Sequence, residues 1–183
     1  MEQKPAKKVT EGYLERAALH YLGRFSSTEA NLKAVLARKV RRRNEDSAPP
    51  SPEQMQWIVA VAAKCVRLGY VDDNFYARQR FRGLQLKGKP LRMIAQDLHY
   101  KGVPAHIVKA VLDEAQKEEG VNPDMAAAAC YARRRRFGPF RRPDTPPEKI
   151  EKEKAAMMRA GFPYALIKQV MDSSVDDLLA LIP

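Results

Sequence analysis

Arginine and lysine are the residues of this chain whose types and spacing could do chemistry, and they fall into three blocks. Guanidinium and ammonium groups bind phosphate and carboxylate groups, so a block of them can hold a polyanion or an acidic protein surface. The blocks lie within residues 38–43, 78–92 and 133–142. The candidate binding residues in them are Arg41, Arg42, Arg43, Arg78, Arg82, Lys89, Arg92, Arg133, Arg134, Arg135 and Arg136. A single block is most simply a solvated helix face, but three blocks in three successive segments favour a binding surface.

The basic excess is spread along the whole chain. The 183 residues include 33 Lys and Arg against 22 Asp and Glu, which gives a formal net charge of +11 at pH 7. Residues 1–50, 51–120 and 121–183 each carry 11 basic residues, with 6, 8 and 8 acidic residues respectively. This distribution predicts a basic strip rather than a basic tail, and it suits a polyanionic or acidic partner.

Residue types used in catalysis and metal binding are few and poorly spaced. His99 and His106 are separated by a Gly-Val-Pro corner, so they do not share a helix face at ligand spacing. The pair Asp72 and Asp73 could hold a metal, but it directly precedes a predicted helix, where capping is the better interpretation. The sequence contains no P-loop, GxSxG or HExxH motif. We therefore expect a protein that is not an enzyme and that has no metal and no cofactor.

The cysteines and the apolar segments indicate where the chain works. Cys65 and Cys130 lie on predicted helices and are interpreted as small core residues, because they form neither a disulfide framework nor a CxxC zinc pair. No apolar run approaches the length of a membrane span, and the N-terminus lacks the apolar stretch of a secretory signal. The expected compartment is the cytoplasm, with no membrane partner.

The elements that must position the basic blocks are all predicted to be helices. Apolar residues recur at helical spacing, and no alternating strand pattern is convincing. Ser51-Pro52-Glu53-Gln54 is a capping-box signal, and the segment 26–29 is interpreted in the same way. The expected fold is all-α with about nine helices. The first three are expected at 12–25, 28–43 and 52–68, and the last three at 124–137, 148–160 and 163–172. Between them we expect one helix that Asp72 or Asp73 caps and Gly88 breaks, one that is marked by Leu91 and Leu98 and stopped by Gly102, and one that Pro104 starts. A last short turn can follow Ser174.

Two segments of the chain repeat each other. Residues 101–113 and 160–172 align without a gap, with identical Gly, Pro, Lys, Val and Asp at five of thirteen positions. In each copy Gly ends one helix, the next residue is apolar and can fold under the turn, and Pro begins the following helix. The pattern predicts three tandem three-helix repeats in an elongated arrangement, at 12–70 (with a loop at 44–51), 71–120 and 121–183, after a disordered basic N-terminus at 1–11.

Several short segments resemble one family of bacterial proteins. Residues 68–78 read Leu-Gly-Tyr-Val-Asp-Asp-Asn-Phe-Tyr-Ala-Arg and resemble the signature that joins the first and second repeats of RecX proteins, regulators of the RecA recombinase. Residues 90–94 and 98–103 are similar to the family's next helix and corner, and residues 27–36 are similar to an early helix. Residues 135–138 and 159–162 resemble its third repeat. The resemblance covers about residues 12–172 and is most specific at 68–103.

The resemblance implies a fold and a function. It implies a non-catalytic, all-helical, monomeric protein that binds RecA and the RecA filament on single-stranded DNA. Such a protein would act mainly as a negative modulator that hinders ATP hydrolysis and strand exchange, within DNA repair, homologous recombination and the SOS response. Some members of the family also contact DNA, so weak non-specific DNA binding is expected.

A direct nucleic-acid-binding protein of the helix-turn-helix type, acting without RecA, is the alternative. The helix at 28–43, with its Arg-rich end, favours this hypothesis. A recognition helix needs base-reading side chains at its start, and Asn31 is the one obvious candidate there.

Overall fold

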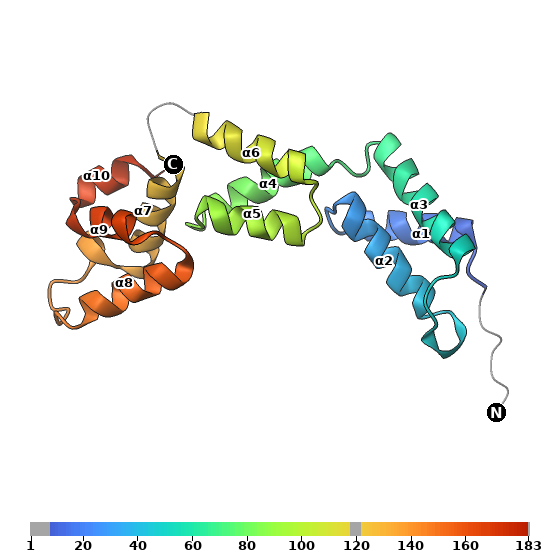
Figure 1. The fold of residues 1–183 in the computed structure, drawn as a ribbon, viewed down its shortest axis with the longest axis horizontal. Coiled ribbons are helices and arrows are strands. Elements are labelled where there is room, and N and C mark those ends of the chain that lie inside the picture. The colour runs from blue at the N-terminus through green and yellow to red at the C-terminus, as the bar shows by residue number, and fades with distance from the viewer. Residues whose placement is uncertain (1–7, 118–121, 183) are drawn as a thin grey trace. The chain divides into compact units, whose positions relative to one another are not determined.

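The computed structural model describes residues 8–117 and 122–182, and within these residues every regular element is a helix (Figure 1). The α-helices are α1 (Glu11–Leu22), α2 (Glu29–Arg41), α3 (Pro52–Arg67), α4 (Asp73–Gln85), α5 (Leu91–Tyr100), α6 (Ala105–Lys117), α7 (Pro123–Arg135), α8 (Lys149–Ala160), α9 (Tyr164–Asp172) and α10 (Val175–Ala180). Two 3₁₀ turns, η1 (Glu45–Ser47) and η2 (Gly138–Phe140), lie in the connections. The predicted all-α fold is confirmed, and α10 is the short turn expected after Ser174.

The chain divides into two compact units. The first comprises residues 1–76 and 101–104, and the second comprises residues 77–100 and 105–183. In element order, α1–α3, α4–α6 and α7–α9 match the three predicted repeats, whose limits at 12–70, 71–120 and 121–183 stay predictions. Most of the N-terminal segment predicted to be disordered, residues 1–7, lies outside the described residues, and α1 already begins at Glu11.

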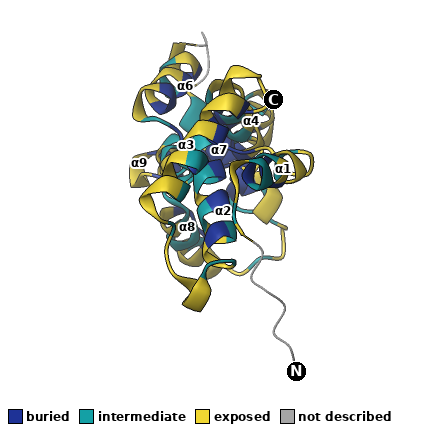
Figure 2. Ribbon diagram, turned by 90° about the vertical axis from the view of Figure 1, so that its right-hand side faces the viewer, coloured by how far each residue is buried: buried dark blue, intermediate teal, exposed yellow. Residues whose placement is uncertain are grey.

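The core of the first unit joins the apolar faces of α1, α2 and α3. Leu14, Leu32, Leu36 and Ile58 are completely buried there. In Figure 2 the helices carry dark blue buried residues on one side and yellow exposed residues on another. Burying one side chain of this size contributes about 1.5–3 kcal/mol to folding, so the apolar stripes read from the sequence provide the main contacts that hold these helices together.

The two predicted capping boxes have different outcomes. At α3 the box is complete, because the Ser51 hydroxyl accepts from the Gln54 backbone and the Gln54 side chain accepts from the Ser51 backbone N–H. At α2 only one of the two hydrogen bonds of a capping box forms, the one accepted by a side-chain hydroxyl. Thr28 caps the helix by accepting from the Asn31 backbone N–H, whereas the Glu29 carboxylate lies too early in the turn to reach back and pairs with Lys33 instead.

The core of the second unit uses the small side chains of α7. Ala128, Ala129 and Ala132 are completely buried and pack with residues of α8, α9 and α10. The turn between α4 and α5 also comes close to α7. A Cβ atom at Gly88 would lie only 2.8 Å from the Ala127 carbonyl oxygen, so this turn requires a glycine.

The two Gly-x-Pro corners predicted from the repeat are confirmed. Gly102 and Gly161 have φ values of +78° and +103°, in the left-handed region that favours glycine. The apolar residues that follow them, Val103 and Phe162, are 4% and 3% exposed and therefore fold under the turn as expected.

Each corner also packs on the first turn of an earlier helix. A Cβ atom at Gly102 would lie 2.7 Å from the Cβ of Ala30 in α2, and one at Gly161 would lie 3.0 Å from the Cγ of Met93 in α5. Beside the first contact, the Thr28 hydroxyl donates a 2.6 Å hydrogen bond to the Lys101 carbonyl oxygen. In both cases the Gly-x-Pro corner of one repeat packs against a helix of the repeat before it.

Two aspartates reinforce the same helix starts. The Asp73 carboxylate accepts a 2.9 Å hydrogen bond from the Glu29 backbone N–H, and the Asp124 carboxylate accepts one of 2.7 Å from the Leu91 backbone N–H. Each aspartate belongs to the first turn of its own helix and satisfies the first N–H group of another. Asp72 caps α4 itself, because its carboxylate accepts a 2.9 Å hydrogen bond from the Phe75 N–H, and this confirms the capping role predicted for the Asp72 and Asp73 pair.

Candidate functional site

The first basic block ends α2, and two of its three candidate arginines hold local structure. Arg41 Nε donates a 2.9 Å hydrogen bond to the Ser47 carbonyl oxygen and so closes the loop around η1. The Arg43 guanidinium lies 3.6 Å from the centroid of the Tyr13 ring, which is a cation–π contact. Arg42 is exposed at the C-cap of the helix, where a positive charge complements the helix dipole.

The second block lies on α4 and at the start of α5, and its members have different surroundings. Arg80, which was not a candidate, donates two hydrogen bonds of 2.7 and 2.8 Å to Asp97. The candidate Arg78 makes only a loose pair with Glu114, at 3.4 Å, and these side chains are 60% and 59% exposed. The candidate Arg82 is exposed and pairs with no carboxylate among the described residues.

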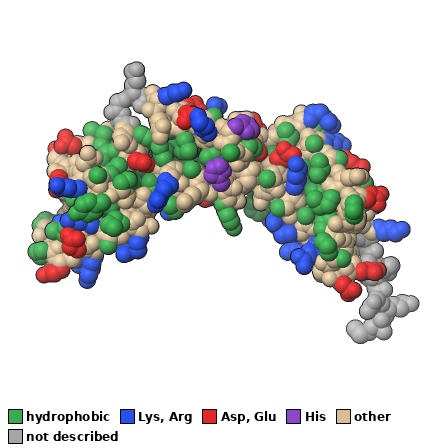
Figure 3. Space-filling model, in the orientation of Figure 1, with side chains coloured by type: hydrophobic (Ala, Val, Ile, Leu, Met, Phe, Trp, Pro, Cys, Tyr) green, Lys and Arg blue, Asp and Glu red, His purple; other side chains and the backbone are tan. Residues whose placement is uncertain are grey.

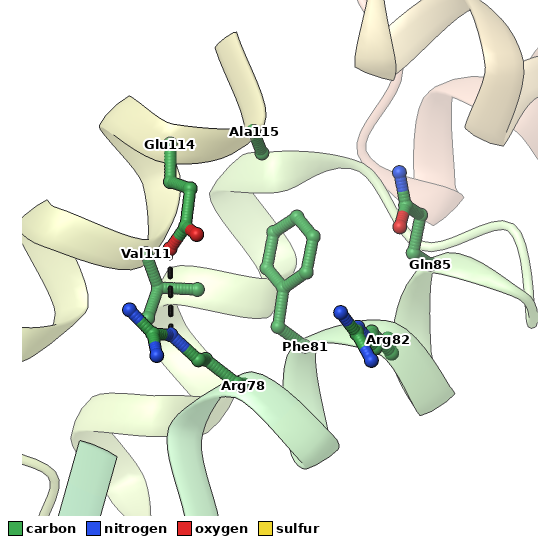
Figure 4. Close-up of a pocket in the computed structure, with 7 residues that line it drawn as sticks. All are labelled: Arg78, Phe81, Arg82, Gln85, Val111, Glu114 and Ala115. Carbon is green, nitrogen blue, oxygen red and sulfur yellow. Dashed lines mark ion pairs between the residues drawn. The ribbon is translucent and has the colours of Figure 1, made fainter. Parts of the chain in front are cut away.

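Arg78 and Arg82 meet at a small pocket between α4 and α6, which is drawn in Figure 4. The pocket has a volume of about 70 Å³ and is called the α4–α6 pocket below. Its lining residues are Arg78, Phe81, Arg82, Gln85, Val111, Glu114 and Ala115. Sequence reasoning did not find it, although the spacing of Arg78, Phe81 and Arg82 already places them on one face of a helix.

The remaining candidates of the second block are exposed as well. Lys89 stands in the turn between α4 and α5, where its backbone N–H donates to the Leu84 carbonyl oxygen. Arg92 stands in the first turn of α5, and its terminal nitrogen would lie 3.4 Å from a Cβ atom at Gly161. The structure therefore brings Arg92 to the corner between α8 and α9.

The third block forms the C-terminal end of α7. Arg133, Arg134, Arg135 and Arg136 are all exposed there. The guanidinium groups of Arg134 and Arg135 lie 5.7 and 5.8 Å from the Tyr131 ring centroid. Arg136 adopts a left-handed conformation, with φ of +57°, and ends the helix. Four adjacent guanidinium groups with no carboxylate among their described partners can hold phosphate or carboxylate groups.

A buried glutamate braces the loop that follows this block. The Glu153 carboxylate accepts hydrogen bonds from Arg141 Nε at 3.0 Å, from an Arg141 terminal nitrogen at 2.6 Å, and from the Gly138 N–H at 3.0 Å. Burial alone would raise the pKa of Glu153, but the hydrogen bonds from Arg141 and Gly138 outweigh it and lower the pKa below its ordinary value of 4.5. Arg141 is thus structural, and Glu153 is a partner that sequence reasoning missed.

The candidates divide between the two units. Arg41, Arg42 and Arg43 belong to the first unit, and the other eight candidates belong to the second. On the face drawn in Figure 3, the described Lys and Arg side chains are intermixed with Asp and Glu side chains. Among the described residues, the end of α7 carries four adjacent exposed arginines, and the α4–α6 pocket brings Arg82 next to the loosely paired Arg78.

The environment of Asn31 bears on the helix-turn-helix alternative. Its side-chain amide donates hydrogen bonds to the Tyr21 hydroxyl at 3.0 Å and to the Ser27 hydroxyl at 2.8 Å. A base-reading asparagine needs this amide group for adenine. Because both donors are used inside the first unit, the structure disfavours α2 as a recognition helix.

The cysteines and the possible metal ligands form no reactive site among the described residues. Cys65 and Cys130 are buried, as predicted for core residues, and burial raises the pKa of both thiols. Over residues 8–117 and 122–182, His, Cys, Asp and Glu side chains nowhere gather in a group of three or more that could hold a metal ion. Within the same residues, no helix combines the length and apolar character needed to cross a membrane.

Comparison with known proteins gives relatives over nearly the whole chain. No protein-family model matches it. The protein named "Regulatory protein RecX" from Myxococcus xanthus (strain DK1622) is 40% identical over 172 residues, which cover 93% of this chain and 90% of the relative. A protein of the same name from Agrobacterium fabrum (strain C58 / ATCC 33970) is 30% identical over 165 residues, covering 90% and 85% of the two chains.

Solved structures share the fold. The crystal structure of RecX from Lactobacillus salivarius matches with a TM-score of 0.59 at 19% identity and covers 93% of this chain and 97% of that one. A second crystal structure, of a regulatory protein RecX, matches with a TM-score of 0.60 at 19% identity, covering 89% and 72%. Because the relative from Myxococcus xanthus is 40% identical along almost the full length of both proteins, this chain belongs to the RecX family of regulatory proteins.

Proposed function

We propose that this chain regulates the RecA recombinase, mainly as a negative modulator, by binding RecA and its filament on single-stranded DNA. Membership of the RecX family is the observation that carries the proposal. The chain would slow ATP hydrolysis and strand exchange by occupying the filament, without catalysing a reaction itself. It would do so as a monomer in the cytoplasm, within DNA repair, homologous recombination and the SOS response.

The exposed basic side chains support this proposal. A RecA filament on DNA presents both protein carboxylates and phosphates, and guanidinium groups bind either of them. Arg133, Arg134, Arg135 and Arg136 form the largest exposed group of such side chains, and Arg82 and Arg92 add two more in the same unit. The three predicted repeats are proposed as the units that contact the filament.

The test is the single-stranded-DNA-dependent ATPase of RecA with the full chain added below one molecule per RecA. We expect the rate of ATP hydrolysis to fall as the chain is added, with strand exchange falling in parallel. An ATPase rate that stays constant at every ratio, from substoichiometric to excess, would rule out this function.

Direct nucleic-acid binding is the second candidate, and the exposed arginines at the end of α7 are the observation that favours it. Binding of the chain to single-stranded and duplex DNA, with and without RecA, separates the two functions. If the chain binds only phosphates, the logarithm of the binding constant should fall linearly with the logarithm of the salt concentration, and it should not depend on the DNA sequence. Tight, sequence-specific duplex binding without RecA would support the second candidate and contradict the first.

A further inference from the structure

The α4–α6 pocket combines an apolar floor with a charged rim. Phe81, Val111 and Ala115 form the floor and are only 6–7% exposed. The rim side chains are Arg78, Arg82, Gln85 and Glu114, and Figure 4 shows them arranged around the Phe81 ring. An apolar floor with a few polar groups at its edge is the usual composition of a ligand site.

The charges of the rim select an anion. The lining contains two arginines and one glutamate, so it carries one net positive charge. The pair of Arg78 and Glu114 is loose and largely exposed, and Arg82 has no carboxylate partner among the described residues. A single incoming carboxylate would balance the pocket. Glu114 already shows that a carboxylate can approach Arg78 at this rim.

The size of the pocket favours a protein side chain over a nucleobase. Its volume is about 70 Å³. A cavity of roughly 150 Å³ is known to take benzene, so half that space admits the end of an aliphatic side chain and excludes most of a base.

We infer that the α4–α6 pocket receives an acidic segment of a partner protein. An aliphatic side chain of that segment enters over Phe81, and a neighbouring Asp or Glu carboxylate lies between the guanidinium groups of Arg78 and Arg82. The inference rests on the proposed function, because it takes RecA as the protein that supplies the segment. It assigns this pocket to protein contact and leaves the arginines at the end of α7 for phosphate.

The test uses two variants of the full chain with opposite expected effects. Binding is measured to RecA filaments formed on poly(dT) with a non-hydrolysable ATP analogue, and to bare poly(dT). Arg82→Glu should weaken filament binding by about tenfold, because it sets a like charge against the incoming carboxylate. Glu114→Gln should strengthen filament binding, because it removes a competing carboxylate, whereas a merely damaged fold would weaken binding in both variants.

Lys87→Glu is the matched control. Lys87 is exposed, lies in the turn directly after α4, and does not line the pocket. Lys87→Glu changes the net charge of the chain by the same amount as Arg82→Glu. We expect Arg82→Glu to weaken filament binding much more than Lys87→Glu does, and the two variants to bind bare poly(dT) equally. Equal filament binding by the two variants would overturn the assignment of the pocket.

Other outcomes point elsewhere. If Arg82→Glu weakens bare poly(dT) binding as strongly as filament binding, the pocket holds phosphate and the inference is wrong. If the wild-type chain self-associates without RecA and Arg82→Glu abolishes this, the occupant is a second copy and the inference is again wrong. If the wild-type chain binds no filament at all, the proposed function itself fails, and this result is distinct from the loss of the pocket contact alone.

Discussion

At the scale of single residues, Glu153 is the one charged side chain that is buried among the described residues. Replacing one partner of a buried ion pair leaves the other without compensation and costs about 3 kcal/mol or more. Glu153→Gln keeps an acceptor for the Gly138 N–H but removes the charge that faces Arg141. We therefore expect the free energy of unfolding at pH 7, measured by urea denaturation, to fall by about this amount. Glu151→Gln, at a glutamate that is 79% exposed and pairs with Lys154, should change this free energy little.

The pKa of Glu153 gives the same prediction a pH dependence. Its pKa in the folded protein lies below the ordinary value of 4.5. The unfolded chain therefore binds more protons in this range, and stability due to Glu153 is present above pH 4.5 and lost as the pH falls through the folded pKa. The wild type should lose stability in this acidic window, and the loss should be smaller in Glu153→Gln. If the free energy of unfolding fell equally with pH in the wild type and in Glu153→Gln, the stabilising role given to the Glu153 carboxylate would be contradicted.

At the scale of elements, the aspartates that cap neighbouring helices should stabilise the packing of the repeats. Asp73→Ala removes the acceptor for the Glu29 N–H, and the loss of such a cap costs about 1 kcal/mol. Asp73→Asn retains an acceptor oxygen and should cost less. Amide hydrogen exchange at the first turn of α2 should accelerate in Asp73→Ala, whereas Asp144→Ala, in an exposed loop, should leave it unchanged.

Burial also raises the pKa of Asp73 above its ordinary value of 3.8. The folded chain thus holds this proton more tightly than the unfolded chain, so the contribution of Asp73 to stability decreases as the pH rises from 3.8 through the folded pKa. This direction is opposite to that of Glu153. Asp73→Asn cannot titrate and should lack this pH dependence. The free energies of unfolding of Asp73→Asn and the wild type, measured across pH 4–7, should therefore converge toward pH 4. Values that move apart toward pH 4 would contradict the raised pKa of Asp73.

The glycine corners allow a matched comparison of two backbone positions. Gly69 and Gly102 have nearly equal φ values of +73° and +78°, but a Cβ atom would meet nothing within 4 Å at Gly69 and the Ala30 Cβ at 2.7 Å at Gly102. Gly69→Ala should cost about 1–2 kcal/mol from backbone strain alone. Gly102→Ala should cost about 1–3 kcal/mol more, because it also overpacks the contact with α2. Equal unfolding midpoints of the two variants would show that the corner does not pack as described.

These elements show what the sequence could and could not predict. The helices, the Gly-x-Pro corners and the Ser51 capping box follow from spacing and capping signals within a few residues. The hydrogen bonds from the Glu29 N–H to Asp73 and from the Leu91 N–H to Asp124 join residues 44 and 33 positions apart, so no local pattern reveals them. The α4–α6 pocket likewise depends on the packing of α6 against α4, which are separate in the sequence. The hydrogen bonds of Glu153 with Gly138 and Arg141 depend on the conformation of the loop after α7.

At the scale of the whole molecule, the question is how the net charge of +11 is divided between phosphate and protein. The double variant Arg134→Glu/Arg135→Glu removes two exposed guanidinium groups from the end of α7, and its helicity by circular dichroism should match that of the wild type. If these groups contact phosphate, DNA binding should weaken and the slope of log K against log salt should fall by about 2. Lys152→Glu/Lys168→Glu has the same change of net charge at exposed positions of the second unit outside the three blocks. A net-charge effect alone would lower the slope equally in both variants, whereas a phosphate site at the end of α7 would lower it only in the first, because counterion release depends on the phosphates that are actually neutralised.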